Sequence, residues 1–196
     1  MDIFLVRHGE AAASWGEAPD PGLSALGRQQ AEEAAAALRQ HVGQHTLLIS
    51  SPLQRALETA APLARELQQA VHTDAVFREI PSPVPLAQRQ AWLRQFMQQQ
   101  WMEQGDDLKA WRRSALDRLL ALQQSAVIFT HFLVINAVVG QVLNKPETLC
   151  FWPDNWSITH GRLRGSNLEL VARPSEMATH VDCGTLRSTG VQAQQA

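Results

Sequence analysis

The sequence has few cysteines and no excess of basic residues. Only two of its 196 residues are cysteine, Cys150 and Cys183, which is too few for a disulfide framework, so we expect free thiols. The formal net charge of -2 argues against broad binding to nucleic acid or to an anionic membrane, because both need a basic excess or a basic face. Any site for an anion must therefore be local.

Long apolar segments are missing as well. The amino terminus has no basic segment followed by an apolar stretch and a small-residue cleavage site, and the longest apolar runs are far shorter than a membrane span. We therefore expect a cytoplasmic protein without a membrane partner. The length and the 45% share of hydrophobic residues predict one domain at 1–177, followed by a polar tail at 178–196 whose composition suits disorder.

The chain repeats a unit in which a buried strand, a few polar residues and a helix follow one another. Continuous apolar runs predict buried strands at 3–6, 47–49 and 126–129. Helices are predicted after them at 24–38, 53–68 and 133–143. This alternation predicts the α/β class, as a three-layer α/β/α sandwich with a mostly parallel sheet.

The remaining segments add edges and helices to this plan. Residues 75–77 predict a short strand, and the prolines of 81–85 exclude regular structure there. Amphipathic spacing predicts two helices, at 86–102 and 108–122, as a helical insertion at about 85–124. Core packing is the expected role of the tryptophans in it, with a lid or a subunit contact as alternatives. Two strands at 157–163 and 167–172 predict an antiparallel hairpin at a sheet edge.

Polar residues that suit a phosphate follow the three buried strands. Arg7 and His8 end the first strand, Arg55 lies one turn into the helix after the second, and His131 ends the third. Ligands of open α/β sheets bind beyond the carboxyl ends of the strands, so these side chains are expected to converge. Two guanidinium groups and two helix amino termini can then meet one phosphate, which predicts a phosphate pocket.

Several motifs occur in a characteristic order along the chain. They are Leu5-Val6-Arg7-His8-Gly9-Glu10, Pro21-Gly22-Leu23-Ser24-x-x-Gly27-x-x-Gln30-Ala31, Ser50-Ser51-Pro52-x-x-Arg55-Ala56-x-x-Thr59-Ala60, Phe77-Arg78-Glu79, Thr130-His131 and Pro153-Asp154-Asn155-Trp156-Ser157-Ile158-Thr159. Together they resemble the histidine phosphatase superfamily, the phosphoglycerate mutase-like proteins, and in particular its small phosphatases. The resemblance covers much of the chain and implies the same sandwich fold.

The resemblance also implies a metal-independent phosphomonoester hydrolase without a cofactor. His8 would be the nucleophile and would form a phosphohistidine that water then hydrolyses. Arg7, Arg55 and His131 would hold the phosphoryl oxygens, and Glu79 would protonate the leaving oxygen. The expected partner is a phosphorylated small molecule or a phosphoprotein.

The chain departs from the family pattern at several positions. Ala11 stands where Ser or Thr is usual and Ser14 where Asn is usual, which predicts a weaker hydrogen bond to the phosphate. Phe132 replaces a common Gly after the second histidine, so its N–H can still donate while its ring is expected to add apolar bulk at the pocket mouth. Ser14 and Phe132 are thus predicted substrate-binding positions. A proline stretch follows Glu79 in place of a Gly-rich segment, so an ordinary loop carboxylate is an equal alternative there.

Other functions and other roles for these residues stay open. The enzyme alternative is a mutase that returns the phosphoryl group to the substrate, and the other alternative is a phosphate-recognition module with little turnover. Arg55 could instead pair with a glutamate on a solvated helix face. His41 and His45 have a spacing that could suit a metal, but Gly43 lies between them and a solvated turn is favoured.

Overall fold

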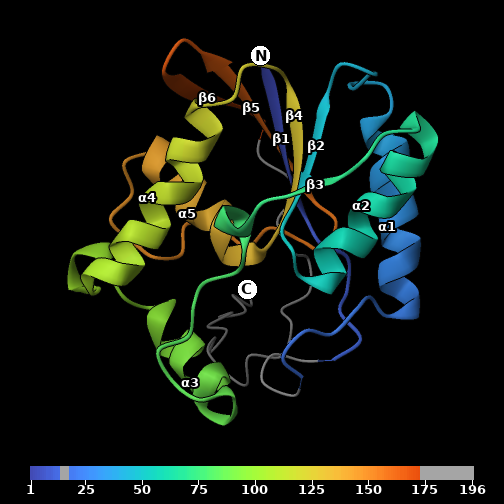
Figure 1. Ribbon diagram of the computed structural model, residues 1–196. Helices are drawn as coiled ribbons and strands as arrows, with labels where there is room; N and C mark the ends of the chain where they lie inside the picture. Colours follow the sequence, from blue (N-terminus) through green and yellow to red (C-terminus); the bar gives the residue numbers. More distant parts are fainter. Residues whose placement is uncertain (14–17, 173–196) are drawn as a thin grey trace, which may run out of the picture.

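The computed structural model describes residues 1–13 and 18–172 (Figure 1). Its strands are β1 (Asp2–Arg7), β2 (Leu47–Ser50), β3 (His72–Thr73), β4 (Ala126–Thr130), β5 (Ile158–Arg164) and β6 (Asn167–Ala172). Its α-helices are α1 (Ala25–Leu38), α2 (Gln54–Leu67), α3 (Leu86–Phe96), α4 (Asp106–Leu120) and α5 (Phe132–Val142). Two short 3₁₀ turns, η1 (Ala75–Phe77) and η2 (Trp101–Glu103), lie between them.

The six strands form one mixed sheet in the order β3-β2-β4-β1-β5-β6. The first four of these pair in parallel, while β5 runs antiparallel to β1 and β6 antiparallel to β5. The predicted mostly parallel sheet with an antiparallel edge is thus confirmed. In the register of the sheet, Arg7 lies opposite Thr130 and Ser50 opposite Phe129. The polar ends of β1, β2 and β4 therefore meet at one edge.

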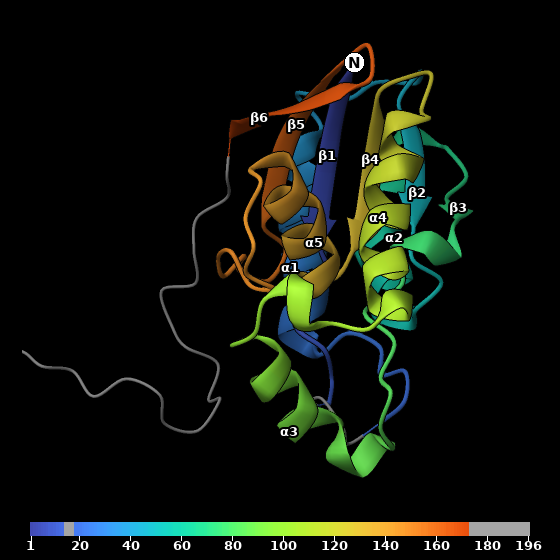
Figure 2. The same ribbon diagram turned by 90° about the vertical axis from the view of Figure 1, so that its left-hand side faces the viewer.

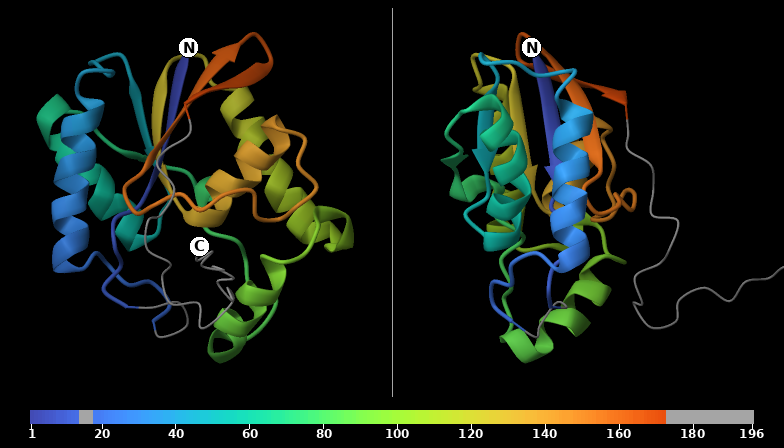
Figure 3. Two further views of the ribbon diagram at one scale, coloured as in Figure 1. Left: turned by 180° about the vertical axis from the view of Figure 1, so that it is seen from behind. Right: turned by 90° about the vertical axis from the view of Figure 1, so that its right-hand side faces the viewer.

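Helices cover both faces of the sheet, which gives the predicted three layers. Alternate side chains of β1 serve the two faces, as expected for a strand buried on both sides. Ile3 and Leu5 join the apolar cluster under α4 and α5, and Phe4 and Val6 join the cluster under α1 and α2. Figure 2 shows α4 and α5 on the near face, and the right-hand view of Figure 3 shows α1, in blue, on the other.

Local structure differs from the prediction at three places, the first of which is the short strand β3, absent from the prediction. Residues 75–77 are not a strand but the 3₁₀ turn η1, because the Asp74 carboxylate accepts a hydrogen bond from the Val76 N–H and caps the turn. Thr130, at the end of β4, connects the turn to the sheet, because its hydroxyl donates a hydrogen bond to the Phe77 carbonyl oxygen over 2.8 Å. The helix predicted at 86–102 ends at Phe96, and the Trp101 N–H instead donates to the Pro146 carbonyl.

The two helices predicted at about 85–124 occupy different places. Ala115 and Leu119 of α4 are buried in the sheet cluster, so α4 belongs to the layer that covers the sheet. In contrast, α3 lies beyond the carboxyl ends of the strands (Figure 2), where Leu93 and Phe96 pack with Trp101 in a separate cluster. Within the described ranges, no helix combines the length and apolarity needed to cross a membrane. The predicted domain boundary at 177 and the polar tail lie outside the described residues.

Candidate active site

The turn after β1 places His8 in the middle of the site. The His8 N–H donates to the Thr130 carbonyl oxygen at 3.0 Å, and its carbonyl accepts from the Trp156 N–H at 3.3 Å. The next N–H, of Gly9, donates to Thr59 Oγ1 on α2 at 3.1 Å. The strand β4, the helix α2 and the loop before β5 thus fix the backbone of the turn, and His8 is only 4% exposed.

Two glycines allow this turn to approach α1 closely. A Cβ on Gly9 would lie 2.5 Å from the Gly27 carbonyl oxygen, and a Cβ on Gly27 would overlap the Glu10 carbonyl oxygen. Ser24 caps α1 by accepting from the Gly27 N–H, and its hydroxyl donates to the Glu10 carboxylate at 2.6 Å. Glu10 therefore supports the geometry of the turn.

The hydrogen bonds of the His8 ring select one neutral tautomer. Its Nδ1 lies 2.7 Å from the Gly9 carbonyl oxygen, which can only accept, so Nδ1 carries the hydrogen. Nε2 then holds a lone pair, which accepts a hydrogen bond from Arg55 Nε over 3.1 Å. Burial, followed by the charges of Arg55 and Arg7, keeps the pKa of His8 well below its ordinary value. His8 is therefore neutral at neutral pH, the state that its predicted role as a nucleophile requires.

His131 is the second histidine of the pair and is fully buried at the amino end of α5. The centroids of the two rings lie 5.2 Å apart. His131 Nε2 lies 2.7 Å from Ser51 Oγ, while Nδ1 is buried without a hydrogen-bond partner among the described residues. Burial, followed by the charges of His8 and Arg55, keeps the pKa of His131 well below its ordinary value. The hydrogen-bond partner of His131 is thus the hydroxyl of Ser51.

Arg55 lies on the buried face of α2 and does not pair with the glutamates that were its alternative partners. Its side chain is close to His8, and its Nη1 lies 3.7 Å from Asp20 Oδ1. Glu58 accepts from the Leu23 N–H, and Glu32 pairs with Arg65. Burial is the main cause that lowers the pKa of Arg55. This guanidinium therefore belongs to the site.

The guanidinium group of Arg7 lies over the aromatic ring of Phe132. Its Nη1 donates to the Pro153 carbonyl oxygen at 2.7 Å, and its guanidinium carbon lies 5.1 Å from the centre of the Phe132 ring. Burial lowers the pKa of Arg7 to about 10, against the opposing attraction of Glu79 and Asp154, so Arg7 is charged at neutral pH.

The prediction that the ring of Phe132 adds apolar bulk at the pocket mouth is wrong. The ring is only 1% exposed, packs against Trp152 and belongs to the apolar cluster of α3 and α5. The first turn of α5 directs it into this cluster, where burial of an aromatic ring is favourable. Phe132 contributes to the site through Arg7. Ser14, the other predicted substrate-binding position, lies outside the described residues.

Glu79 follows η1 and reaches the first turn of α5. Its Oε1 accepts from the Ile80 N–H at 3.0 Å, and its Oε2 accepts from the Leu133 N–H at 3.5 Å. Burial raises the pKa of Glu79, although these hydrogen bonds and the charge of Arg55 oppose it. The carboxyl group thus retains its proton to a higher pH than an exposed glutamate would, which suits a proton donor.

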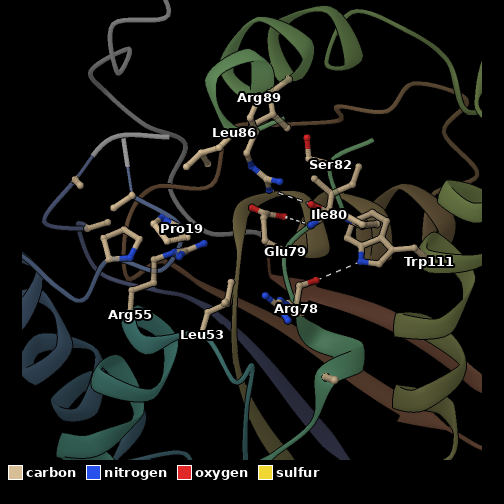
Figure 4. A pocket seen from close by; sticks show the side chains of 17 residues that line it. Pro19, Leu53, Arg55, Arg78, Glu79, Ile80, Ser82, Leu86, Arg89 and Trp111 are labelled. Carbon is tan, nitrogen blue, oxygen red and sulfur yellow. Dashed lines mark hydrogen bonds between the residues drawn. The ribbon is translucent and has the colours of Figure 1, made fainter. Parts of the chain in front are cut away.

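A cavity of about 510 Å³ is lined by two of the site residues, Arg55 and Glu79 (Figure 4). Leu53, Ile80 and Trp111 contribute apolar walls. It is therefore large enough for the organic part of a small phosphorylated molecule. His41 and His45, the histidines with a metal-like spacing, are exposed in the turn after α1.

Two positioning residues belong to the sequence motifs but had no role assigned from the sequence. Thr59 accepts from the Gly9 N–H and donates to the Arg55 carbonyl oxygen at 2.7 Å, so it joins the histidine turn to α2. Its position four residues after Arg55, on the same helix face, was the available signal. Ser51 supports His131, and only the fold reveals that contact.

Two phosphatases are among the solved structures of similar fold. A phosphoserine phosphatase from Entamoeba histolytica, in complex with 3-phosphoglyceric acid, superposes with a TM-score of 0.69 and 24% identity over 89% of this chain and 96% of that one. A mycobacterial glucosyl-3-phosphoglycerate phosphatase, in complex with inorganic phosphate, gives a TM-score of 0.69 and 24% identity over 89% and 97%. At this identity the likeness supports the fold alone.

A sequence relative and the family itself give the remaining comparisons. The uncharacterized protein Rv0525 of Mycobacterium tuberculosis is 43% identical over 76 residues, which span 37% of this chain and 37% of that protein. Residues 3–173, most of the chain, match the histidine phosphatase superfamily (branch 1). The buried histidine pair at the ends of β1 and β4 agrees with this match, and the chain belongs to the histidine phosphatase superfamily, branch 1.

Proposed function

We propose that this protein is a metal-independent phosphomonoester hydrolase that works through a phosphohistidine on His8. The observation that carries the proposal is the hydrogen bonding of the His8 ring. Its Nδ1–H is committed to the Gly9 carbonyl, so its lone pair is on Nε2, beside two buried arginines. A neutral, oriented imidazole between cations suits attack on an anionic phosphoryl group.

In the first step, Nε2 of His8 forms a bond to phosphorus while the bond from phosphorus to the leaving oxygen breaks. The electron pair of the broken bond goes to the leaving oxygen, which takes the proton of Glu79. Arg55 must leave Nε2 for the phosphoryl oxygens, where Arg7 and the unused Nδ1 of His131 are further candidates to bind. The Gly9 carbonyl stabilises the positive ring that results.

In the second step, water attacks phosphorus and the bond to Nε2 breaks, which returns the electron pair to His8. Glu79, now a carboxylate, accepts the proton of the water, and inorganic phosphate leaves. Apart from the substrate and one water molecule, no group outside the chain is needed for the balance of these steps. Membership of the histidine phosphatase superfamily supports hydrolysis. The 3-phosphoglyceric acid bound to one structure of similar fold suits a phosphorylated small molecule as the substrate.

The test is to trap the intermediate on EDTA-treated enzyme. Rapid quenching with a ³²P-labelled phosphomonoester should give an acid-labile, base-stable adduct on His8, and free phosphate should be the final product. His8→Asn should form no adduct, whereas His45→Asn, the same change at an exposed turn histidine, should behave as the wild type.

Three results would contradict the proposal. They are an adduct on another residue, full activity in His8→Asn, and an activity that EDTA removes and Mg²⁺ or Zn²⁺ restores. A phosphorylated isomer of the substrate in place of free phosphate would identify the mutase alternative.

A further inference from the structure

A fully buried amide group on α5 has no role in the chemistry proposed above. Asn136 lies one turn after Phe132, the first residue of this helix. Its Nδ2 donates to the Phe132 carbonyl oxygen at 3.1 Å, and its Oδ1 accepts from the N–H groups of Cys150 at 2.8 Å and Phe151 at 3.1 Å. Because an N–H can only donate and a carbonyl can only accept, these partners fix the orientation of the amide.

The three hydrogen bonds of Asn136 join the first turn of α5 to the segment that follows the helix. Cys150 and Phe151 belong to irregular structure between α5 and β5. Buried backbone N–H groups need an acceptor, and where no strand or helix supplies one a side-chain oxygen can do so. Asn136 therefore sets the position of this segment relative to Phe132.

Both of the segments that Asn136 joins contact Arg7. The Pro153 carbonyl oxygen accepts from Arg7 Nη1 at 2.7 Å, and the Phe132 ring lies under the guanidinium group at 5.1 Å. The charge of Asp154, the next residue, attracts Arg7 and opposes the fall in its pKa that burial causes. One amide thus connects the residue that supplies the ring with the segment that supplies the acceptor.

An arginine that is held in place before its ligand arrives binds this ligand at a lower cost. A free arginine side chain has several rotatable bonds, and fixing them on binding costs conformational entropy. Arg7 is already restrained by the Pro153 carbonyl and the Phe132 ring. A phosphoryl group beside His8 would therefore meet a guanidinium whose ordering cost is largely met by the fold.

We propose that Asn136 is a positioning residue of the phosphate site, which holds Arg7 in the orientation that binds the phosphoryl group. It acts through the Phe132 ring and the Pro153 carbonyl rather than by contact with the substrate. This inference rests on the proposed function for the identity of the site, but it concerns the binding of phosphate, which can be measured without turnover.

The experiment is a double-mutant cycle on the binding of inorganic phosphate. Asn136→Leu replaces the amide by an apolar side chain of similar volume, so the N–H groups of Cys150 and Phe151 lose their acceptor. Dissociation constants are measured by ³¹P NMR titration at constant ionic strength, because salt screens charges. Asn136→Leu should raise the dissociation constant about tenfold in the wild type but less than about twofold in the Arg7→Gln background, as expected for residues that act through one another.

Two controls separate an action through Arg7 from a general loss of structure. In the Arg55→Gln background, Asn136→Leu should still weaken binding about tenfold, because Arg55 is placed by α2. Thr148→Val removes another fully buried anchor between α5 and β5, a hydroxyl that donates to the Gln99 carbonyl oxygen at 3.0 Å. Thr148→Val should lower the free energy of unfolding in urea and leave the dissociation constant of phosphate unchanged.

An equal loss of phosphate affinity in the wild-type and Arg7→Gln backgrounds would overturn the inference, because Asn136 would then act on the whole site. Unchanged affinity in Asn136→Leu, or an equal loss in Thr148→Val, would overturn it as well. If Asn136→Leu fails to fold, Asn136→Asp takes its place in the cycle, because it keeps an oxygen for the two N–H groups and loses only the donor to Phe132.

The failure of this inference and that of the proposed function are distinct. Coupling between Asn136 and Arg7 without release of phosphate from a phosphomonoester would reject the hydrolase and keep the role of Asn136. Hydrolysis through His8 without this coupling would do the reverse. A wild type that binds no inorganic phosphate would overturn both.

Discussion

Arg55 covers the lone pair of His8 that the proposed reaction needs. Its Nε donates to His8 Nε2 across 3.1 Å, and the two residues are 8% and 4% exposed. The carboxylate of Asp20 lies 3.7 Å from Arg55 Nη1 and gives only a partial counterion. A phosphoryl dianion is a stronger partner for a buried guanidinium, so its arrival would draw Arg55 away from Nε2 and release the nucleophile.

Replacement of Arg55 should therefore impair the reaction even though it uncovers His8. Removal of a charge-assisted hydrogen bond from a water-poor site costs on the order of 2 to 4 kcal/mol of transition-state stabilisation, so Arg55→Ala should lower kcat/KM roughly a hundredfold or more. Arg65→Ala removes an exposed arginine of the same helix and should have little effect. Wild-type kinetics in Arg55→Ala would exclude Arg55 from phosphate binding.

The role of Glu79 should depend on the leaving group. An aryl phosphate such as p-nitrophenyl phosphate expels a stabilised phenolate, whereas an alkyl phosphate expels a basic alkoxide that needs a proton. In single-turnover experiments, Glu79→Gln should retain much of the phosphorylation rate with the aryl ester and lose roughly a hundredfold or more with the alkyl ester. Glu33→Gln, at an exposed position of α1, is the control. Equal losses with both esters would remove Glu79 from the acid role.

The pH dependence should reflect the same carboxyl group. The pKa of Glu79 is raised by burial, so its acid form persists above the ordinary value of 4.5, and the reaction of an alkyl phosphate should slow as pH rises through the raised value. The pKa of His8 is lowered, so this residue stays neutral and reactive below its ordinary value of 6.5. Rates are measured against pH and corrected for ionisation of the substrate. Glu79→Gln should lack the alkaline fall of the wild type, and an unchanged fall would assign it to another group.

Stability should depend on the packing between the histidine turn and α1. A methyl group on Gly27 would overlap the Glu10 backbone, so Gly27→Ala should lower the free energy of unfolding by about 1 to 3 kcal/mol. At Gly43 a methyl group would meet no atom within 4 Å. Gly43→Ala should therefore leave the free energy of unfolding unchanged or raise it by up to about 1 kcal/mol. Urea denaturation measures both. Equal stability of the two variants would show that the turn after β1 moves to make room for the methyl group without a loss of stability.

The sequence by itself determined the order of the three buried strands and of the helices that follow them, and the chemical types at the ends of these strands. Buried parallel strands are marked by continuous apolar runs, and parallel strands place their carboxyl ends at one edge of the sheet. The convergence of Arg7, His8, Arg55 and His131 followed from these two facts and the motif order. The family could be identified from the same residues.

Only the tertiary structure decided the contacts that set the hydrogen bonds, the burial and the pKa values of these residues. Arg55 meets His8 Nε2 because α2 packs against the turn after β1, a contact across 47 residues of sequence. Val76 and Phe77 favour a strand locally, yet the Asp74 cap and the hydrogen bond from Thr130 hold a 3₁₀ turn there. The burial of Phe132 and the elevated pKa of Glu79 likewise depend on neighbours that are distant in sequence. Local patterns encode which backbone forms are favourable, whereas desolvation and long-range hydrogen bonds exist only once the layers have packed.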